Sequence, residues 1–335
     1  MIITRTPFRI SFLGGGTDYP DWYKENGGAV LSTTINKYCY LSCRDLPPFF
    51  KHKYRVVYSY QELVKKIEDI KHPSVRNTLS FLNMDRGVEI HHQADLPAKS
   101  GLGSSSSFTV GLVNALSGLK GEIKNKRQLA LDAIHIEQNL IKENVGSQDQ
   151  TAAAFGGFNK IDFGGVQEIS IQPITINSSR LESFQNHLML FFTGLSRDAS
   201  KIAKEQVRNI RDKSKELKVM HGMVNEGTAI LTNGKTDLAE FGKLMNQSWR
   251  VKKSLSSKIT NPYLDNLYEA GIKAGALGGK LLGAGGGGFI LFFAKPEAQD
   301  KIKNKLKNLL HVPFQFDHLG SQIIYYAQDN NDQIK

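Results

Sequence analysis

The stretch from Leu96 to Ser107 constrains the fold of this chain more than any other, because it combines a strand end, a glycine-rich turn and a helix start. Residues 88–94 before it alternate in polarity, and the residues after Ser107 are largely apolar. Glycines let the backbone approach a ligand closely, and the free N–H groups at a helix N-terminus attract anions. One serine is enough to cap a helix. Four serines beside two glycines therefore indicate a phosphate-binding turn rather than a simple cap.

The rest of the chain predicts mixed strands and helices, with no internal repeat or low-complexity linker. Residues 1–13 alternate in polarity, which indicates a strand with one solvent-exposed face. Further strands are expected at residues 28–43, 53–60, 187–192, 289–293 and 322–327. Helices are expected at residues 60–70, 75–82, 127–143, 220–231, 238–256, 262–274 and 297–310, and a long amphipathic helix is expected to follow residue 198.

Length and composition limit the class of protein. A chain of 335 residues with 40% apolar content can bury two ordinary cores, so two domains are expected. The longest apolar run, residues 289–294, is too short to cross a membrane, and the N-terminus lacks a signal-peptide pattern. A cytoplasmic protein without a membrane partner is expected. Cys39 and Cys43 lie in an expected strand and are interpreted as reduced, structural thiols.

The net charge of +11 is compatible with nucleic acid, an acidic membrane surface or small anionic substrates. The basic residues are interleaved with acidic and apolar ones, and no basic block is joined to stacking aromatics. This distribution favours attraction of phosphorylated small molecules. Nucleic-acid binding is the least favoured class.

Two further glycine-rich segments stand far apart in the sequence. The first, Leu13 to Pro20, contains three glycines and then Thr17 and Asp18, whose carboxylate could bind sugar hydroxyls or cap its own turn. The second, residues 283–288, matches G-x-G-x-x-G, but a strand is expected after it instead of a helix, which excludes a dinucleotide fingerprint. No Walker A motif is present. A glycine turn packed against another loop is the remaining interpretation.

Glu137 lies inside the apolar stripe of the helix expected at residues 127–143, which should open with Asn125 as its cap. A buried carboxylate is costly unless it is paired, so a cation partner is expected. A structural pair with Lys or Arg is the common solution. A hard divalent ion is the sharper alternative, because Mg²⁺ favours one or two carboxylates plus substrate phosphates and waters.

Asp149 follows Ser147, which can cap a short helix and place Asp149 in its first turn. The helix dipole favours an ionised carboxylate there. Near a phosphate site, such a carboxylate is a candidate base for a substrate hydroxyl. On this motif alone, an ordinary first-turn aspartate is the favoured interpretation.

Taken together, residues 7–20, 96–107 and 280–289 resemble the three signature motifs of the GHMP family of small-molecule kinases, in the family's order, with Glu137 and Asp149 at matching offsets. The resemblance implies a two-domain α+β protein. Residues 1–183 would form a ribosomal S5 domain 2-like domain that binds ATP, residues 184–335 a ferredoxin-like domain, and the substrate would lie between them.

The resemblance also implies roles for single residues. Asp149 would take the proton of the acceptor hydroxyl or orient that hydroxyl, and Arg9 would keep this carboxylate ionised and neutralise charge on the transferred phosphoryl group. Ser105 and Glu137 would complete a Mg²⁺ shell. The ATP phosphates would be held by Lys99, Ser100, Gly101, Leu102, Gly103, Ser104, Ser105, Ser106 and Ser107. The substrate would be held by Gly15, Gly16, Thr17, Asp18, Ser196, Arg197, Gly285 and Gly286.

Within the family, residues 8–20, 193–197 and 248–254 are most similar to kinases of D-glycero-D-manno-heptose 7-phosphate. This similarity implies phosphorylation of the C1 hydroxyl to the 1,7-bisphosphate, for nucleotide-activated heptose of a capsule, S-layer or lipopolysaccharide. Galactokinases carry Glu-His where this chain has Gly15 and Gly16, and the missing side chains favour a larger acceptor. Cationic contacts to its phosphate could come from Arg197, Arg250, Lys252 or Lys253.

Two alternatives stay open at this point. The chain could be another sugar 1-kinase of the family, such as a fucokinase or hexose kinase. It could also be a non-catalytic relative that binds ATP and sugar as a regulator, although the presence of Asp149, Glu137 and Ser105 argues against that. Both a monomer and a homodimer are compatible with the sequence.

Overall fold

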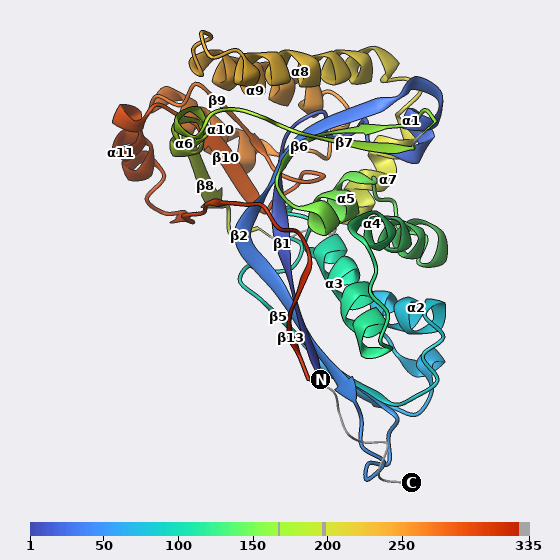
Figure 1. The fold of residues 1–335 in the computed structure, drawn as a ribbon. Helices are drawn as coiled ribbons and strands as arrows, with labels where there is room; N and C mark the ends of the chain where they lie inside the picture. Colours follow the sequence, from blue (N-terminus) through green and yellow to red (C-terminus); the bar gives the residue numbers. More distant parts are fainter. Residues whose placement is uncertain (167, 196–198, 328–335) are drawn as a thin grey trace.

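The computed structural model describes residues 1–166, 168–195 and 199–327 and is built on two sheets (Figure 1). The main path of the larger, nine-stranded sheet is β13-β1-β2-β5-β3-β4, with β12 and β6 also paired to β2, and β7 paired to β6. Its strands are β1 (Ile2–Leu13), β2 (Gly28–Asp45), β3 (Tyr54–Val57), β4 (Gln61–Val64), β5 (Val88–Ala94), β6 (Phe158–Phe163), β7 (Ile169–Pro173), β12 (Phe316–Asp317) and β13 (Gln322–Tyr326). All its pairings are antiparallel except β3 with β5.

Helices α2 (Pro73–Phe81), α3 (Ser104–Leu119), α4 (Lys126–His135) and α5 (Gln148–Phe155) lie together on one side of the long strands (Figure 1). A π-helical turn, η2 (Ile136–Leu140), continues α4, and a 3₁₀ turn, η1 (Ile67–Asp69), precedes α2. Helix α1 (Pro20–Asn26) follows the first glycine segment. These elements and the strands β1 to β7 make up the part of the chain that carries the serine-rich turn.

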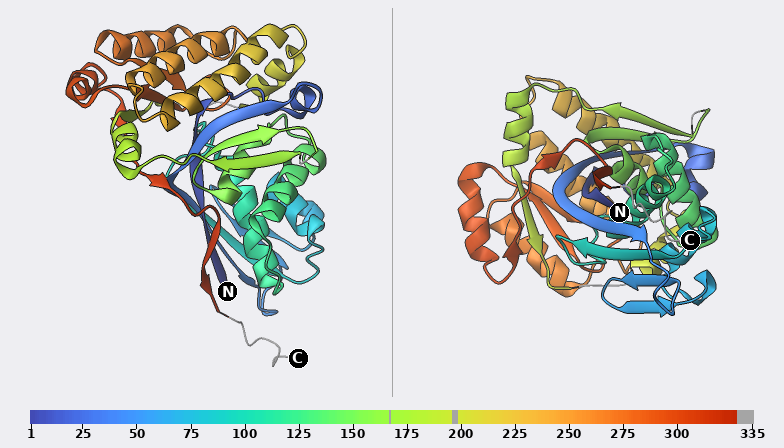
Figure 2. Two further views of the ribbon diagram at one scale, coloured as in Figure 1. Left: turned by 45° about the horizontal axis from the view of Figure 1, so that its top comes forward. Right: turned by 60° about the horizontal axis from the view of Figure 1, so that its bottom comes forward.

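The second sheet is four-stranded and antiparallel, in the order β11-β8-β10-β9. Its strands are β8 (Leu188–Phe192), β9 (Gly278–Leu281), β10 (Phe289–Phe293) and β11 (Leu310–His311). The accompanying helices are α6 (Ser178–Asn186), α7 (Ala199–Arg208), α8 (Ser214–Thr232), α9 (Ala239–Lys253), α10 (Pro262–Lys273) and α11 (Pro296–Lys305). In the left view of Figure 2, the gold and orange helices of residues 214–273 cover the top of the molecule. The mixed helix-and-sheet class expected from the sequence is confirmed.

Strand β1 has no solvent-exposed face over most of its length, which corrects the expectation from its alternating pattern. Every residue from Thr6 to Leu13 is buried. Helices α3 and α5 contact this strand, and so do α8 and α9 from the second half of the chain. Polar residues in this half of β1 therefore face the protein interior, where they can form a site.

A cluster of phenylalanines joins the two sheets. The ring of Phe12 on β1 lies 5.4 Å from that of Phe184 on α6 and 5.9 Å from that of Phe241 on α9. Phe184 in turn lies 5.6 Å from Phe293 on β10. Edge-to-face and tilted aromatic pairs of this kind stabilise a core beyond the burial of their area. One large hydrophobic cluster therefore contains buried residues of both halves of the chain, and the domain boundary at residue 183 stays a prediction.

The prediction of a helix at residues 60–70 is wrong. The chain forms a hairpin of β3 and β4 there, and the nearly buried carboxylate of Glu62 holds the next turn in place. This carboxylate accepts hydrogen bonds from the backbone N–H groups of Lys71 and His72 and from the Tyr58 hydroxyl. A carboxylate that binds backbone donors nine and ten residues further on stabilises a turn that local propensity cannot indicate.

Other expectations are confirmed with changed boundaries. The helix expected at residues 75–82 is α2, whereas the long helix after residue 198 is divided into α7 and α8 by residues 209–213.

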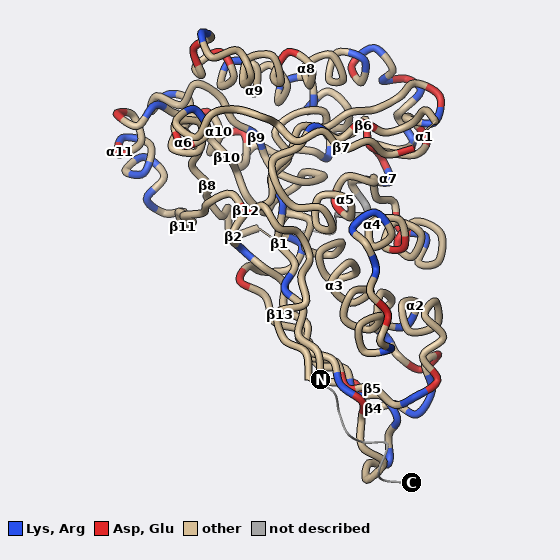
Figure 3. The backbone as a smooth tube through the Cα atoms, in the orientation of Figure 1, with Lys and Arg blue, Asp and Glu red and all other residues tan. Residues whose placement is uncertain are grey.

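Cys39 and Cys43 are buried and not disulfide-bonded, as expected. Lys and Arg are scattered along the whole chain among acidic residues (Figure 3). Within the described residues, no helix combines the length and the apolar character needed to cross a membrane.

Candidate active site

The serine-rich turn is held in place by a direct backbone contact with the glycine segment at residues 283–288. Gly101 and Gly283 both adopt positive φ, +83° and +75°, and a Cβ added to Gly283 would lie 2.6 Å from Gly101 Cα. A Cβ added to Gly101 would lie 2.5 Å from the Leu282 carbonyl oxygen. The expectation that residues 283–288 form a glycine turn packed against another loop is thereby confirmed.

Replacing Gly283 with Ala is expected to lower the free energy of unfolding by about 2–5 kcal/mol, since the new Cβ adds overpacking to left-handed strain. The KM for ATP should rise with it, because the displaced loop supports the serine-rich turn. Gly121 offers a matched control, since its φ is +82° and a Cβ there would meet nothing within 4 Å. G121A should cost only about 1–2 kcal/mol. Urea denaturation of both variants measures the difference, and equal losses would contradict the proposed contact.

Arg9 on β1 connects the turn to Asp149, which lies in the first turn of α5. The Arg9 Nε and NH2 groups donate to the two carboxylate oxygens of Asp149 at 2.8 and 2.7 Å, and the NH1 group donates to the Gly101 carbonyl at 2.8 Å. A Cβ added to Gly103 would lie 3.4 Å from Asp149 Oδ2. The Asp149 carboxylate therefore lies against the start of α3 in a bidentate ion pair, which is a strong and well-oriented arrangement.

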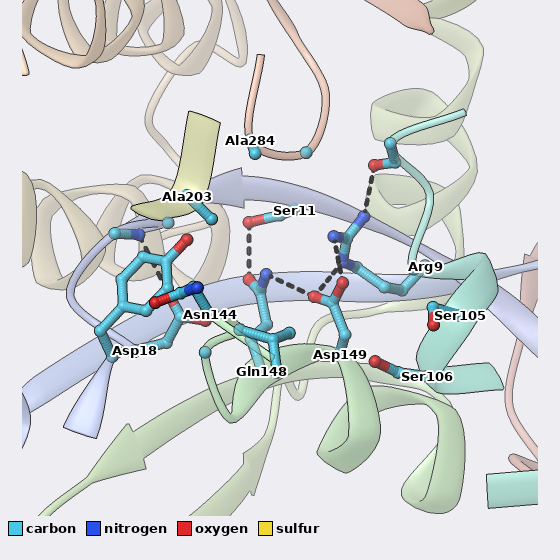
Figure 4. Close-up of a pocket in the computed structure, with 18 of the residues that line it drawn as sticks. Arg9, Ser11, Asp18, Ser105, Ser106, Asn144, Gln148, Asp149, Ala203 and Ala284 are labelled. Carbon is cyan, nitrogen blue, oxygen red and sulfur yellow. Dashed lines mark hydrogen bonds and ion pairs between the residues drawn. The ribbon is translucent and has the colours of Figure 1, made fainter. Parts of the chain in front are cut away.

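Ser11 and Gln148 extend this hydrogen-bonded chain, and the sequence analysis missed both. The Ser11 hydroxyl donates to Gln148 Oε1 at 2.6 Å, and Gln148 Nε2 donates to Asp149 Oδ1 at 3.2 Å (Figure 4). Ser147 occupies the N-cap position of α5 and Asp149 lies in the first turn, as predicted, but the Ser147 hydroxyl forms no capping hydrogen bond because it interacts with Tyr23 and Gln138.

Glu137 is fully buried in the π-helical turn η2, where Ile141 N–H donates to the carbonyl of Ile136, five residues back. The extra residue in such a turn breaks the α-helical pattern and often marks a functional position. The sequence predicted a continuous helix through residue 143, which is wrong. It did place Glu137 among apolar residues, as found.

The environment of Glu137 leaves one carboxylate oxygen unsatisfied. Oε2 accepts hydrogen bonds from Ser106 at 2.8 Å and from Gln150, whereas Oε1 accepts no well-formed hydrogen bond among the described residues, although the Thr109 hydroxyl also interacts with the carboxylate and acts to lower its pKa. Burial raises the pKa of Glu137 to about 7. No Lys or Arg among the described residues pairs with it, so the structural ion pair considered from the sequence is absent there. A buried orphan oxygen beside a serine hydroxyl suits a hard cation such as Mg²⁺.

A cavity of about 190 Å³ lies between the serine-rich turn and the ion pair of Arg9 with Asp149, and Glu137 does not line it but contacts Ser106, which does. The lining residues come from all three glycine segments and include Arg9, Ser11, Gly15, Gly16, Asp18, Lys99, Gly101, Gly103, Ser104, Ser105, Ser106, Gln148, Asp149, Lys252, Lys280, Gly283 and Ala284. Figure 4 shows Asp149 and Gln148 on one side of it and Ala284 on the other. Within the described residues, no group of three or more His, Cys, Asp or Glu side chains could hold a metal alone.

Some predicted site residues support the cavity instead of lining it. Gly285 and Gly286 pack against the backbone of Ile259, and the Thr17 hydroxyl donates to backbone carbonyls of Gly14 and Ala29. Leu102 is core, the Ser107 hydroxyl donates to the Pro7 carbonyl, and Ser100 is buried. Ser196 and Arg197 lie outside the described residues.

Asp18 and Lys252 occupy the side of the cavity formed by the first glycine segment. Asp18 Oδ1 accepts a hydrogen bond from Gly16 N–H at 2.9 Å, and burial raises the pKa of Asp18. Of the basic residues proposed to contact a substrate phosphate, Arg250 is exposed and Lys253 pairs with Asp265. Among the described basic residues proposed for this role, Lys252 is the one that lines the cavity.

Comparisons with known proteins place these features in one family. The model of the GHMP kinases N terminal domain matches residues 62–157, and that of GHMP kinases C terminal matches residues 229–312. A D-glycero-alpha-D-manno-heptose 7-phosphate kinase of Campylobacter jejuni is 31% identical over 321 residues, covering 91% of this chain and 93% of the relative.

Solved structures show the same fold. A D-glycero-D-manno-heptose 1-phosphate kinase from Bacteriodes thetaiotaomicron has a TM-score of 0.80 at 21% identity and covers 98% of this chain and 100% of its own. Galactokinase of Lactococcus lactis in complex with galactose has a TM-score of 0.74 at 19% identity and covers 96% of this chain and 94% of its own.

Proposed function

The chain belongs to the GHMP kinase family, and from this premise we propose that it transfers the γ-phosphoryl group of ATP to the C1 hydroxyl of D-glycero-D-manno-heptose 7-phosphate. The product would be the 1,7-bisphosphate. After removal of the C7 phosphate, the remaining C1 phosphate could accept a nucleotidyl group. The similarity to a heptose 7-phosphate kinase along nearly the whole chain supports this acceptor.

One observation carries the proposal: the serine-rich turn, the ion pair of Arg9 with Asp149, and Ser106, which contacts Glu137, all meet at one cavity. Phosphoryl transfer requires mainly alignment of the reactants and stabilisation of charge on the transferred group. The N-terminus of α3 supplies free N–H groups for phosphate oxygens. The Arg9 side chain supplies a fixed positive charge beside them.

The proposed transfer needs few chemical roles from the chain's own residues. The acceptor oxygen would attack the γ-phosphorus, the bond from that phosphorus to the departing ADP oxygen would break, and the hydroxyl proton would pass to Asp149. Arg9, Ser11 and Gln148 keep the Asp149 carboxylate in one orientation. Glu137, with Ser105 or Ser106, would hold Mg²⁺, which when bound neutralises phosphate charge.

The region of Gly15 and Gly16 supports a large, anionic acceptor. These residues line the cavity without side chains, next to Asp18 and the buried ammonium group of Lys252. Asp18 can accept hydrogen bonds from sugar hydroxyls. A phosphate on the acceptor would balance part of the positive charge.

A panel of acceptors tests the proposal with the purified protein, ATP and Mg²⁺. We expect kcat/KM for the heptose 7-phosphate to exceed that for the unphosphorylated heptose by about 10- to 100-fold, the value of one or two charge-assisted hydrogen bonds. Fucose, galactose and mannose should be poor acceptors. Equal use of the unphosphorylated heptose would contradict the assignment.

A second sugar 1-kinase activity has a specific observation in its favour. The bifunctional fucokinase/GDP-fucose pyrophosphorylase of Arabidopsis thaliana is 26% identical over a match that covers 93% of this chain and 31% of that protein. A preference for fucose in the same panel would support that alternative. A non-catalytic regulator would bind ATP without turnover with any acceptor.

A further inference from the structure

Two lysines on the cavity wall are buried, and neither has an ion-pair partner in the part of the chain that the structure describes. Lys252 comes from α9 and Lys280 from β9, and only 5% and 4% of their surfaces are exposed. Both line the cavity next to Arg9. Among the described residues, no carboxylate lies within 4.0 Å of either ammonium group. Buried charges are normally paired, because desolvation of an unpaired ion is expensive.

Each of these ammonium groups uses one hydrogen bond and keeps donors in reserve. Lys252 Nζ donates to the Gly15 carbonyl at 2.9 Å, and Lys280 Nζ donates to the Phe12 carbonyl at 3.0 Å. An ammonium group carries three N–H donors. A Cβ added to Gly15 or Gly16 would lie 3.7 or 3.9 Å from Lys252 Nζ, so these glycines leave the ammonium group uncovered.

Two of the acidic residues on the cavity wall, Asp149 and Asp18, do not neutralise this pair. Asp149 is bound by Arg9, and Asp18 attracts Lys252 from beyond ion-pair distance while it accepts from Gly16 N–H. Burial lowers the pKa of Lys252 to about 8, and burial together with repulsion from Lys252 and Arg9 holds the pKa of Lys280 well below its ordinary value. The positive charge is therefore costly until an anion enters.

We propose that Lys252 and Lys280 form an anion subsite, separate from the serine-rich turn, that holds a phosphate dianion. Phosphate matches the site because it has several acceptor oxygens and a double negative charge. The inference rests on the proposed function for the source of that phosphate: the group already carried by the acceptor sugar, or the phosphoryl group in transfer. Lys280 was not among the residues indicated by the sequence.

The test replaces each lysine with methionine, which keeps the length of the side chain and removes the charge. Removing an unpaired buried charge should not weaken the fold. Lys253→Met is the matched control, because Lys253 lies next in α9 and pairs with Asp265 instead of lining the cavity. Lys252→Arg retains the charge and is expected to rescue at least part of the function, which a purely structural role would not predict.

Calorimetric titration with heptose 7-phosphate, the unphosphorylated heptose and a non-hydrolysable ATP analogue separates the two sources. If the acceptor phosphate occupies the subsite, K252M and K280M should weaken binding of the sugar phosphate by roughly 10- to 100-fold and leave the other two ligands within about 2-fold. If the transferred group occupies it, kcat should fall by a similar factor with either sugar while acceptor affinity is unchanged. Unchanged affinities and unchanged kcat in both variants would overturn the subsite.

Proton uptake gives a second readout. A dianion beside Lys252 raises the pKa of that ammonium group, so wild-type binding at about pH 8.5 should take up protons, seen as a dependence of the heat on buffer ionisation. This uptake should be smaller in K252M, where Lys280 is the remaining lysine of the subsite that can take up a proton; equal uptake in K252M and wild type would contradict the role of Lys252. A wild-type preference for an unphosphorylated sugar would instead refute the proposed acceptor, and the subsite would then be judged by kcat with that sugar.

Discussion

Asp149→Asn should lower kcat by about 10²- to 10⁴-fold, the usual contribution of a positioned general base, and should change the affinity for ATP by no more than a few-fold. Asparagine retains the shape of the side chain but cannot accept the hydroxyl proton. Its amide also cannot form the bidentate ion pair with Arg9 that holds the group at 2.7 and 2.8 Å. Single-turnover kinetics and fluorescence titration with a nucleotide analogue measure the two quantities separately.

Asp132→Asn is the control for this experiment. Asp132 is another buried carboxylate, on the neighbouring helix α4, where it pairs with Lys124 and does not line the cavity. Its replacement should cost stability and leave kcat unchanged. If D149N lost nucleotide affinity in parallel with kcat, Asp149 would be a structural residue and the proposed role would be wrong.

Glu137→Gln should reduce kcat by about 100-fold or more, since a bound metal supplies several kcal/mol of charge stabilisation. A readout without turnover is available as well. Mg²⁺ with ADP should raise the melting temperature of the wild type and have no such effect on E137Q beyond that of ADP alone. A variant that gained the same stabilisation from Mg²⁺ would exclude Glu137 as a ligand.

The same variant should change the pH dependence of stability in metal-free buffer. The pKa of Glu137 is raised to about 7 in the folded protein from 4.5, so the folded state binds more protons than the unfolded state between these values. The protonated Glu137 side chain therefore makes its full contribution to the free energy of unfolding below about pH 4.5. This contribution is lost as the pH rises toward 7, by roughly 3 kcal/mol in total. Denaturant unfolding at pH 5 and pH 8 should show this loss in the wild type and not in E137Q.

The sequence was informative wherever chemistry and local pattern coincide. The order of glycines and serines predicted a turn at the start of α3, and the apolar stripe predicted that Glu137 is buried. The family resemblance gave the overall fold and the pairing of Arg9 with Asp149. The roles of these residues in binding and catalysis stay predictions.

The rest depends on contacts between distant segments, which a single sequence does not record. The burial of β1 on both faces requires α8 and α9, which lie some two hundred residues away. Gln148 could have been noticed, since glutamines flank Asp149 on both sides and Gln150 contacts Glu137. Lys280 also left a signal, because it stands alone as a charged residue between two glycines and a leucine, directly before a glycine turn.

The final strands have a consequence for how the protein folds. β13 pairs with β1, and the N-terminal amino group of Met1 donates to the carbonyl of Ala327, 326 residues away. Contacts so distant in the chain slow folding, because a very large loop must close before they form. During synthesis, the outer edge of β1, the strand that bears Arg9, therefore stays unpaired until the ribosome has released nearly all of the chain described here.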